Sequence, residues 1–280
     1  MITMLWIIAA FVGVFGLIIG SFLNVVIYRV PAGFSIVSPP SACPRCGTEI
    51  KAYDNIPLVS WLALRGRCRT CAEPISARYP LVELGTGAFF ALVAWRFWPF
   101  HAGAETGAAH LGAGILLLVA LLYLAAISVT LSLIDLDTHK LPNSIVLPSY
   151  LVGAVLLGAS GLLAGDGRAL LTALVGAAAA FAFYFILAIA IPGGMGFGDV
   201  KLAGVLGLFL GFLGWQELVV GVFAAFVVGG LFALALVIVR RAGRKSGIPF
   251  GPWMIVGAWI GAFVGAPLID SYLSVVGLSS

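Results

Sequence analysis

Two short segments of the sequence place acidic side chains at the edges of long apolar runs. The segment "LIDLDTHKLPN" contains Asp135 and Asp137, and the segment "GMGFGDVKL" contains Asp199. Ionisable groups beside membrane-length apolar runs are costly, so each one is a candidate for function. Two carboxyl groups that lie close together can share one proton and activate a water molecule, one acting as base and the other as acid. Asp135 and Asp199 are our candidates for such a catalytic pair.

The two aspartates are expected at opposite ends of their helices. Asp135 would lie near the C-terminal end of one apolar helix, where the helix dipole disfavours negative charge. Asp199 would lie near the N-terminal end of another helix, where the dipole favours it. We therefore expect Asp135 to hold the shared proton and Asp199 to be the ionised base at rest, within a pair that titrates as a unit.

Glycines surround the second aspartate. Gly193, Gly194, Gly196 and Gly198 would let the backbone kink and let a substrate strand approach closely. Gly196, Gly198 and Lys201 are our candidates for a supporting active-site loop. The alternative is a plain turn followed by an Asp–Lys pair at the membrane edge. A phosphate-binding loop is disfavoured because the segment lacks the strand context and the GK[ST] ending.

The first aspartate segment also permits a metal site. Asp135, Asp137 and His139 alternate along the chain in a D-x-D-x-H pattern. We disfavour this interpretation because the further ligands that such a site needs are not evident downstream. A hydrated loop is the simpler alternative for Asp137 and His139.

All four cysteines fall in one hydrophilic stretch, as two CxxC pairs. Cys43 and Cys46 form the first pair, Cys68 and Cys71 the second, and 21 residues separate the pairs. This spacing is typical of tetrahedral thiolate coordination of Zn²⁺, and four protein ligands would make the metal structural. Two disulfides are the alternative, which a reducing cytoplasmic location disfavours. A redox CxxC is also disfavoured, because the pairs are matched and close.

The composition indicates a membrane protein. Of 280 residues, 62% are hydrophobic and only 9% are charged, whereas a soluble domain carries about a quarter charged residues. The fold class that we expect is an all-α polytopic membrane protein, because the apolar runs repeat at about 20 residues and no short alternating segments of a barrel occur. The net charge of +4 does not indicate nucleic-acid binding, since the basic residues lie in loops between spans. The N-terminus does not resemble a cleaved signal peptide.

We predict about eight transmembrane helices, the sixth of them short. Thirteen of the 15 Lys and Arg residues fall in one set of loops, which the positive-inside rule makes cytoplasmic, with both termini external. The resulting organisation is a first helix (1–27), a small cytoplasmic zinc-binding insert (28–80) and a transmembrane core (81–280). The predicted spans are 4–27, 81–99, 112–134, 144–164, 169–191, 200–214, 217–239 and 251–275.

Two other classes of protein fit part of this pattern. A transporter or channel could use the acids as a proton or cation relay, but such groups usually lie near the middle of the bilayer. A membrane scaffold could use the zinc insert to dock a partner, but it would leave the paired acids unexplained. The clustering of the acids at one membrane edge therefore favours a protease.

Several motifs together resemble a known family. "IDLDTHKLPN" and "GMGFGDVKL" are similar to the paired signatures of the prepilin peptidases, also called type IV leader peptidases, which are GxGD-type intramembrane aspartyl proteases. "GSFLNVVIYRVP" and the segment "CPRCGTEIKAYDNIPLVSWLALRGRCRTC" resemble the bacterial form with its zinc-binding insert. The resemblance covers nearly the whole chain. One departure is Asn143, where the signature often has Asp.

The resemblance implies a catalytic pair and a substrate. It maps the two catalytic aspartates onto Asp135 and Asp199, while Asp137 is not the usual catalytic position. The family cleaves the basic leader of type IV prepilins and type II secretion pseudopilins on the cytoplasmic side of the bacterial inner membrane. Many bacterial members then N-methylate the new N-terminus with S-adenosylmethionine. Recognition of a basic leader would need acidic residues, and Glu83 in "RYPLVE" is our first candidate.

Overall fold

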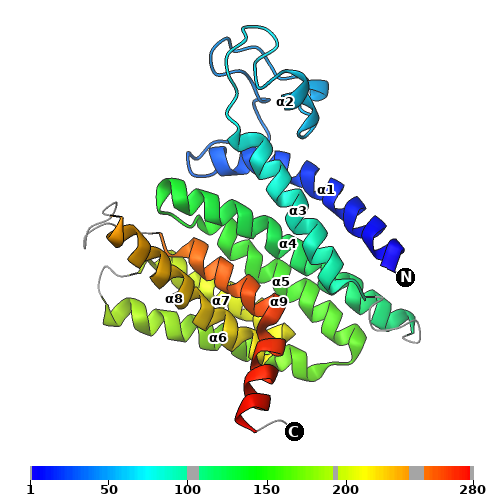
Figure 1. Ribbon diagram of the computed structural model, residues 1–280, viewed down its shortest axis with the longest axis vertical. Helices are drawn as coiled ribbons and strands as arrows, with labels where there is room; N and C mark the ends of the chain where they lie inside the picture. Colours follow the sequence, from blue (N-terminus) through cyan, green and yellow to red (C-terminus); the bar gives the residue numbers. More distant parts are fainter. Residues whose placement is uncertain (1, 100–106, 192–194, 240–248, 278–280) are drawn as a thin grey trace. The chain divides into compact units, whose positions relative to one another are not determined.

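The computed structural model describes residues 2–99, 107–191, 195–239 and 249–277. Within these ranges the chain is helical and contains no strand, apart from two isolated β-bridges. This confirms the predicted all-α membrane fold (Figure 1). The elements are α1 (Ile2–Arg29), η1 (Ala52–Asp54), α2 (Val59–Ala63), α3 (Arg78–Phe97), α4 (Ala108–Thr138), α5 (Asn143–Ala164), α6 (Gly167–Ala190), α7 (Phe197–Leu213), α8 (Trp215–Ile238) and α9 (Gly251–Val276).

Each predicted span corresponds to a helix. Seven helices of the described part are long and apolar enough to cross a membrane. The eighth is α7, which has 17 residues and matches the short sixth span of the prediction. Helices are the expected outcome, because a bilayer offers no hydrogen-bonding partners and a helix satisfies its own backbone groups. The chain is therefore a multi-pass membrane protein.

Contacts divide the chain into two compact units. Unit 1 comprises Met1–His101 and Leu121–Ile134, and unit 2 comprises Ala102–Ala120 and Asp135–Ser280. Both candidate aspartates belong to unit 2, and all four cysteines belong to unit 1. The division of the chain at residues 28–80 into a separate insert domain stays a prediction.

Unit 1 is built on close contact between α1 and α3 (Figure 1). A Cβ atom added at Gly20 would lie 2.7 Å from Glu83 Cα, and one added at Gly16 would lie 2.9 Å from Gly87 Cα. Such distances leave no room for a side chain, so the glycines allow the two backbones to approach. Small residues are the usual means of packing helices in lipid, where the hydrophobic effect does not drive helix association.

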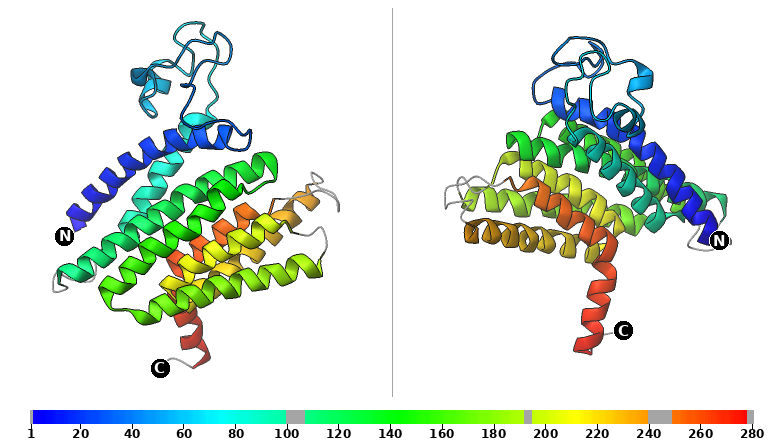
Figure 2. Two further views of the ribbon diagram at one scale, coloured as in Figure 1. Left: turned by 180° about the vertical axis from the view of Figure 1, so that it is seen from behind. Right: turned by 45° about the horizontal axis from the view of Figure 1, so that its top comes forward.

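Unit 2 surrounds a short central helix. Every residue of α7 from Val200 to Gly211 except Lys201 is buried, and α7 contacts α5, α6, α8 and α9 (Figure 2). The close approach of α6 to α7 depends on Gly176, where an added Cβ would lie 2.7 Å from the Gly207 carbonyl oxygen. Burial on all sides explains how so short a helix persists among longer ones.

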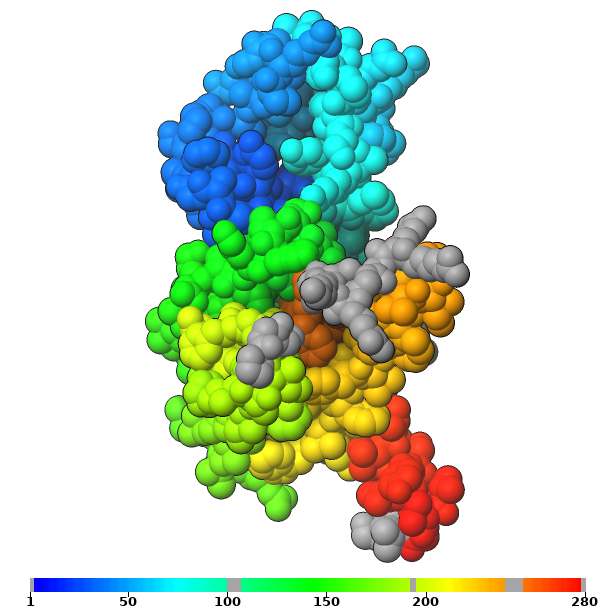
Figure 3. Space-filling model, turned by 90° about the vertical axis from the view of Figure 1, so that its left-hand side faces the viewer, coloured from blue at the N-terminus to red at the C-terminus, as the bar shows by residue number. Residues whose placement is uncertain are grey.

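The last helix bends and leaves the rest of unit 2. Pro267 lies inside α9, and a proline within a helix removes a hydrogen bond and produces a kink. Figures 2 and 3 show the final turns of α9 standing clear of the neighbouring helices. Tyr272 and Val275 in these turns are exposed, as expected for side chains that face lipid.

Candidate active site

Asp135 lies in the last turn of α4, the position that the sequence predicted. Its side chain is buried, with 5% of the residue exposed. The carboxylate oxygen Oδ2 accepts a hydrogen bond of 3.1 Å from the backbone N–H of Gly251, the first residue of α9. The helix ends because His139 adopts a left-handed conformation, with φ of 54°. The connection to α5 then passes through Leu141 and Pro142.

Asp199 lies in the first turn of α7, also as the sequence predicted. It is 8% exposed, and its Oδ2 accepts a hydrogen bond of 3.0 Å from the backbone N–H of Gly196, the N-cap residue. An acid at this position satisfies one of the free N–H groups at the start of a helix and interacts favourably with the helix dipole. The segment that precedes α7 therefore orients the second carboxylate.

Leu141 links the segments that carry the two acids. A Cβ atom added at Gly198 would lie 3.1 Å from Leu141 Cβ, and one added at Gly251 would lie 3.4 Å from Leu141 Cδ1. Through these contacts the structure brings the surroundings of two carboxyl groups, 64 residues apart in the sequence, together in one unit.

Lys201 joins the start of α7 to the start of α5. Its Nζ donates a hydrogen bond of 2.9 Å to Asn143 Oδ1 and lies 4.8 Å from the centre of the Phe197 ring. The Lys201 carbonyl oxygen accepts a hydrogen bond of 2.7 Å from the Tyr150 hydroxyl. Lys201 therefore connects two helix starts beside the site. Its partner Asn143 stands at the position where the family signature often has Asp.

The glycines around Asp199 contribute to the site in different ways. At Gly198 a side chain would press on Leu141, since an added Cβ would lie 3.1 Å from Leu141 Cβ. Gly196 has φ of −82°, which any residue can adopt, so its contribution is the backbone N–H that Asp199 accepts. Gly193 and Gly194 lie outside the described residues.

The structure gives no support to a metal site at the first aspartate. Asp135 is buried, whereas Asp137 and His139 are exposed. In the described part of the chain, the one group of three or more potential ligands close enough to hold a metal ion consists of the four cysteines.

The two CxxC pairs meet in the segment between α1 and α3. All four Sγ atoms lie within 4.8 Å of one another; Cys43 Sγ is 3.7 Å from Cys71 Sγ, and Cys46 Sγ is 4.0 Å from Cys68 Sγ. Thiolates bound tetrahedrally to Zn²⁺ at about 2.3 Å would be about 3.8 Å apart. The donor set and its spacing therefore fit a closed, four-coordinate zinc site.

Each pair forms the same hairpin turn. The N–H of Gly47 donates to the Cys43 carbonyl, and the N–H of Ala72 donates to the Cys68 carbonyl. Both residues have positive φ, 69° for Gly47 and 58° for Ala72. Gly47 adopts this conformation easily because glycine has no Cβ, while Ala72 adopts it without that advantage.

The thiols differ in their readiness to ionise. Hydrogen bonding from the Thr48 side chain and backbone lowers the pKa of Cys46 to about 6. A backbone hydrogen bond from Glu73 favours the Cys71 thiolate, but desolvation and the neighbouring thiols raise the pKa of Cys71 to about 12. Four clustered thiols cannot all ionise without a cation to offset their charge, which is what a metal ion would supply.

Glu83 is not a freely exposed acid. Only 8% of the residue is exposed, and its Oε2 accepts a hydrogen bond of 2.8 Å from the backbone N–H of Leu58. Leu58 has φ of 60° and ψ of −48°, and the Val59 N–H bonds to the Pro57 carbonyl in a strained γ-turn. The role of Glu83 in leader recognition stays a prediction. Its hydrogen bond to Leu58 adds a second role, which is to anchor the segment before α2.

No motif in the sequence singled out Gly251 or Leu141. One available signal was the "FGPW" segment at the predicted cytoplasmic start of the last span. The first N–H groups of a helix have no partner within the helix and favour anions. A helix that starts at the depth of the aspartates could therefore have been expected to donate to one of them.

Comparisons with known proteins identify the family. The family described as "Type IV leader peptidase family" matches residues 122–234, and the "Bacterial Peptidase A24 N-terminal domain" matches residues 14–97. A relative from Stutzerimonas stutzeri, "Prepilin leader peptidase/N-methyltransferase", is 37% identical, and the alignment covers 93% of this chain and 92% of the relative. The chain belongs to the type IV leader peptidase family.

Further relatives carry the same description. The one from Aeromonas salmonicida (strain A449) is 36% identical over 97% of this chain and 96% of its own length, and the one from Pseudomonas aeruginosa is 35% identical over 94% and 92%. No solved structure matches the chain. The resemblance that the sequence motifs predicted is thereby confirmed across both the N-terminal and the peptidase regions.

Proposed function

We propose that this chain hydrolyses the leader peptide from type IV prepilins and then N-methylates the new N-terminal residue. Membership in the type IV leader peptidase family supports the substrate class and both reactions. The observation that supports the catalytic assignment is the similar burial and hydrogen bonding of Asp135 and Asp199. Both are buried, each accepts one backbone N–H, and neither forms an ion pair with a described Lys or Arg residue. Buried acids without a cationic partner are typical of functional sites.

The two carboxyl groups divide the work of hydrolysis. The ionised carboxylate accepts a proton from a water molecule while the water oxygen attacks the carbonyl carbon of the scissile peptide. The protonated carboxyl group donates its proton to the carbonyl oxygen, which gives a tetrahedral intermediate. The C–N bond then breaks as the leaving nitrogen takes up a proton. The products are a leader with a new carboxyl terminus and a pilin with a new amino terminus.

The membrane position of the pair suits this substrate. We propose that the acids face the cytoplasmic boundary of the bacterial inner membrane, with both termini external, as the charge distribution predicts. A prepilin has its basic leader in the cytoplasm and an apolar helix after it, so the scissile bond would reach this depth. Pseudopilins of type II secretion have the same arrangement and belong to the proposed substrate class.

Two cofactors accompany the proposal. One Zn²⁺ would be held by the four cysteines and would order the segment between α1 and α3, since no ligand position stays open for catalysis. S-adenosylmethionine would supply the methyl group for the N-terminal amine. Neither the cavity beside Tyr184 nor the apolar groove that includes Trp6 and Trp95 offers groups to bind its ribose and purine, so we assign no residues to the methyl donor.

Mass spectrometry of a prepilin incubated with the purified protein in lipid nanodiscs tests both reactions. Leader removal and one added methyl group are expected when S-adenosylmethionine is present, and leader removal alone when it is omitted. Asp135→Asn and Asp199→Asn should each reduce cleavage by at least about 100-fold, as expected for loss of a general acid or base. Substantial cleavage by either variant contradicts the assignment of the pair.

A further inference from the structure

Tyr184 carries a hydroxyl group for which the described residues offer no hydrogen-bonding partner. The residue lies near the C-terminal end of α6 and is 2% exposed. Its hydroxyl makes no hydrogen bond to these residues, whereas the hydroxyl of Tyr150, a half-buried residue of the same unit, bonds to the Lys201 carbonyl. In the described part of the chain the one fully buried polar side-chain atom without a partner is Trp253 Nε1, so the Tyr184 hydroxyl keeps a little exposure although its ring is buried. A donor in this position can bond to a group that reaches it.

Packing does not explain the hydroxyl. The Tyr184 ring lies among phenylalanines, 5.5 Å from the rings of Phe183 and Phe226 and 6.3 Å from the ring of Phe250, measured between centroids. Each neighbour supplies an aromatic ring without a polar group. A phenylalanine at position 184 would fill the same space without a hydroxyl group.

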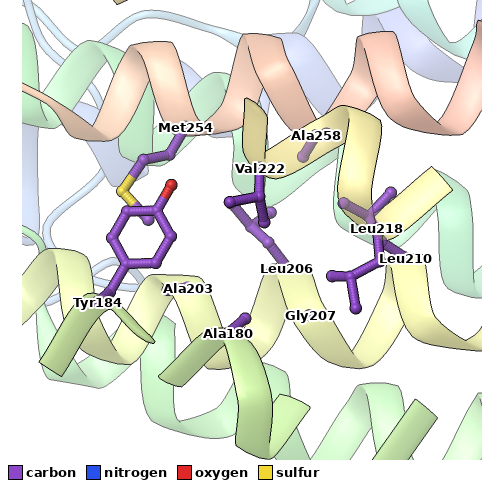
Figure 4. Close-up of a pocket in the computed structure, with 11 residues that line it drawn as sticks. Ala180, Tyr184, Ala203, Leu206, Gly207, Leu210, Leu218, Val222, Met254 and Ala258 are labelled. Atoms are coloured by element: carbon purple, nitrogen blue, oxygen red, sulfur yellow. The ribbon is translucent and has the colours of Figure 1, made fainter. Parts of the chain in front are cut away.

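The hydroxyl points into a small cavity one turn along α7 from Asp199. Figure 4 shows it directed away from α6 towards the helix of Met254. The cavity is lined by Ala203 of α7 and Met254 of α9, among others, and has a volume of about 10 Å³, room for about one water molecule. Ala203 lies four residues after Asp199 and therefore on the same face of α7, one turn deeper into the membrane.

A second contact ties Tyr184 to the other aspartate. Phe250, which packs on the Tyr184 ring, directly precedes Gly251, whose N–H holds the Asp135 carboxylate. Tyr184 therefore contacts the residue before Gly251 and shares a cavity with Ala203, one turn along α7 from Asp199.

The reaction creates a need for a hydrogen-bond donor at this place. To be hydrolysed at the membrane boundary, a helical substrate must unwind, and each unwound residue exposes a carbonyl group that lipid cannot satisfy. The carbonyls nearest the membrane belong to the peptide on the C-terminal side of the scissile bond. A phenol O–H buried there is a suitable donor.

We propose that the Tyr184 hydroxyl binds the unwound substrate by donating a hydrogen bond to a backbone carbonyl oxygen on the membrane side of the scissile bond. This inference rests on the proposed function. It makes Tyr184 a substrate-binding residue whose partner arrives with the prepilin.

The test is Tyr184→Phe, with Tyr150→Phe as the matched control. Prepilin cleavage and thermal unfolding are measured for both variants in nanodiscs. Tyr184→Phe should lower kcat/KM by about tenfold, the effect of one hydrogen bond of about 1.4 kcal/mol, without lowering the unfolding temperature. Tyr150→Phe loses a bond present in the free enzyme, so it should lower the unfolding temperature.

Two results overturn the proposal. One is a fall in kcat/KM of less than about threefold for Tyr184→Phe, which would mean that the hydroxyl has no partner in the substrate. The other is a fall in its unfolding temperature as large as that of Tyr150→Phe, which would mean that the hydroxyl supports the fold. Asp199→Asn is assayed alongside, because cleavage by that variant contradicts the proposed function itself, whatever Tyr184→Phe does.

Discussion

The backbone N–H of Gly251 donates a hydrogen bond of 3.1 Å to Asp135 Oδ2, across 116 residues of sequence. The donor is one of the N–H groups that every helix leaves unpaired at its N-terminal end, and here α9 offers it to a buried carboxylate. A backbone donor cannot rotate away as a side chain can. The contact therefore fixes the orientation of one acid and leaves its other oxygen for a proton or water.

The first prediction concerns Gly251→Ala. An added Cβ would lie 2.7 Å from Asp135 Oδ2, so the carboxylate must move although the N–H donor is retained. Because displacement of a catalytic group by about 1 Å can cost about 100-fold, cleavage should fall at least about tenfold. Initial rates with a prepilin peptide measure this effect, and thermal unfolding shows whether the variant is folded.

Gly230→Ala is the control for that prediction. It also introduces one methyl group into a helix of unit 2, but no atom lies within 4 Å of the added Cβ. It should cleave at the rate of the original protein. Equal rates for Gly251→Ala and Gly230→Ala would show that the orientation of Asp135 does not depend on this contact.

The second prediction concerns the bond between Lys201 and Asn143. Lys201→Met and Asn143→Ala each remove the hydrogen bond of 2.9 Å, which is solvent-exposed, so each should reduce cleavage by less than about tenfold. The double variant should be no worse than the more affected single variant, since both changes break one interaction. Additive losses in this double-mutant cycle would show that the two residues act separately. Asn143→Asp, which keeps an acceptor for Lys201, should remain active.

Much of the fold could be predicted because membrane helices obey few rules. Apolar runs of bilayer length, separated by charged or Gly- and Pro-containing loops, marked each of the eight long helices, α7 among them. The helix ends were less predictable. α4 continues four residues beyond the predicted end at residue 134, so Asp135 lies inside the helix. The true end was hard to predict because the residue that ends the helix in a left-handed conformation is His139, whereas glycine is the usual signal.

The candidate site was predictable only in part. The placement of Asp135 and Asp199 at one membrane edge followed from counting spans, since depth is set by topology. The packing of Leu141 on Gly198 and Gly251 could not be anticipated, because it depends on which helices are neighbours. The hydroxyl of Tyr184 was also missed: a tyrosine within an aromatic cluster becomes informative only when the structure shows that it has no partner.

The third prediction concerns zinc. The purified protein should contain about one zinc ion per chain by elemental analysis, and Cys43→Ser should lose most of it, because structural zinc sites need their full set of ligands. Hydrogen exchange of the segment between α1 and α3 should rise in that variant while α7 and α9 are unaffected. Asp199→Asn should retain its zinc. Full zinc occupancy in Cys43→Ser would contradict the four-thiolate site.

The last prediction separates two roles for Glu83. If the residue mainly anchors Leu58, Glu83→Gln should keep activity, because the amide oxygen can still accept the backbone N–H that now bonds to Oε2, whereas Glu83→Ala should lose it. If the residue instead recognises a basic leader by its charge, both variants should raise KM for a native leader. Hydrogen exchange of the Leu58 amide measures whether the anchor is intact. Faster exchange in Glu83→Ala and little change in Glu83→Gln support anchoring. A rise in KM in Glu83→Gln, with exchange at Leu58 unchanged, would show that leader recognition requires the carboxylate charge.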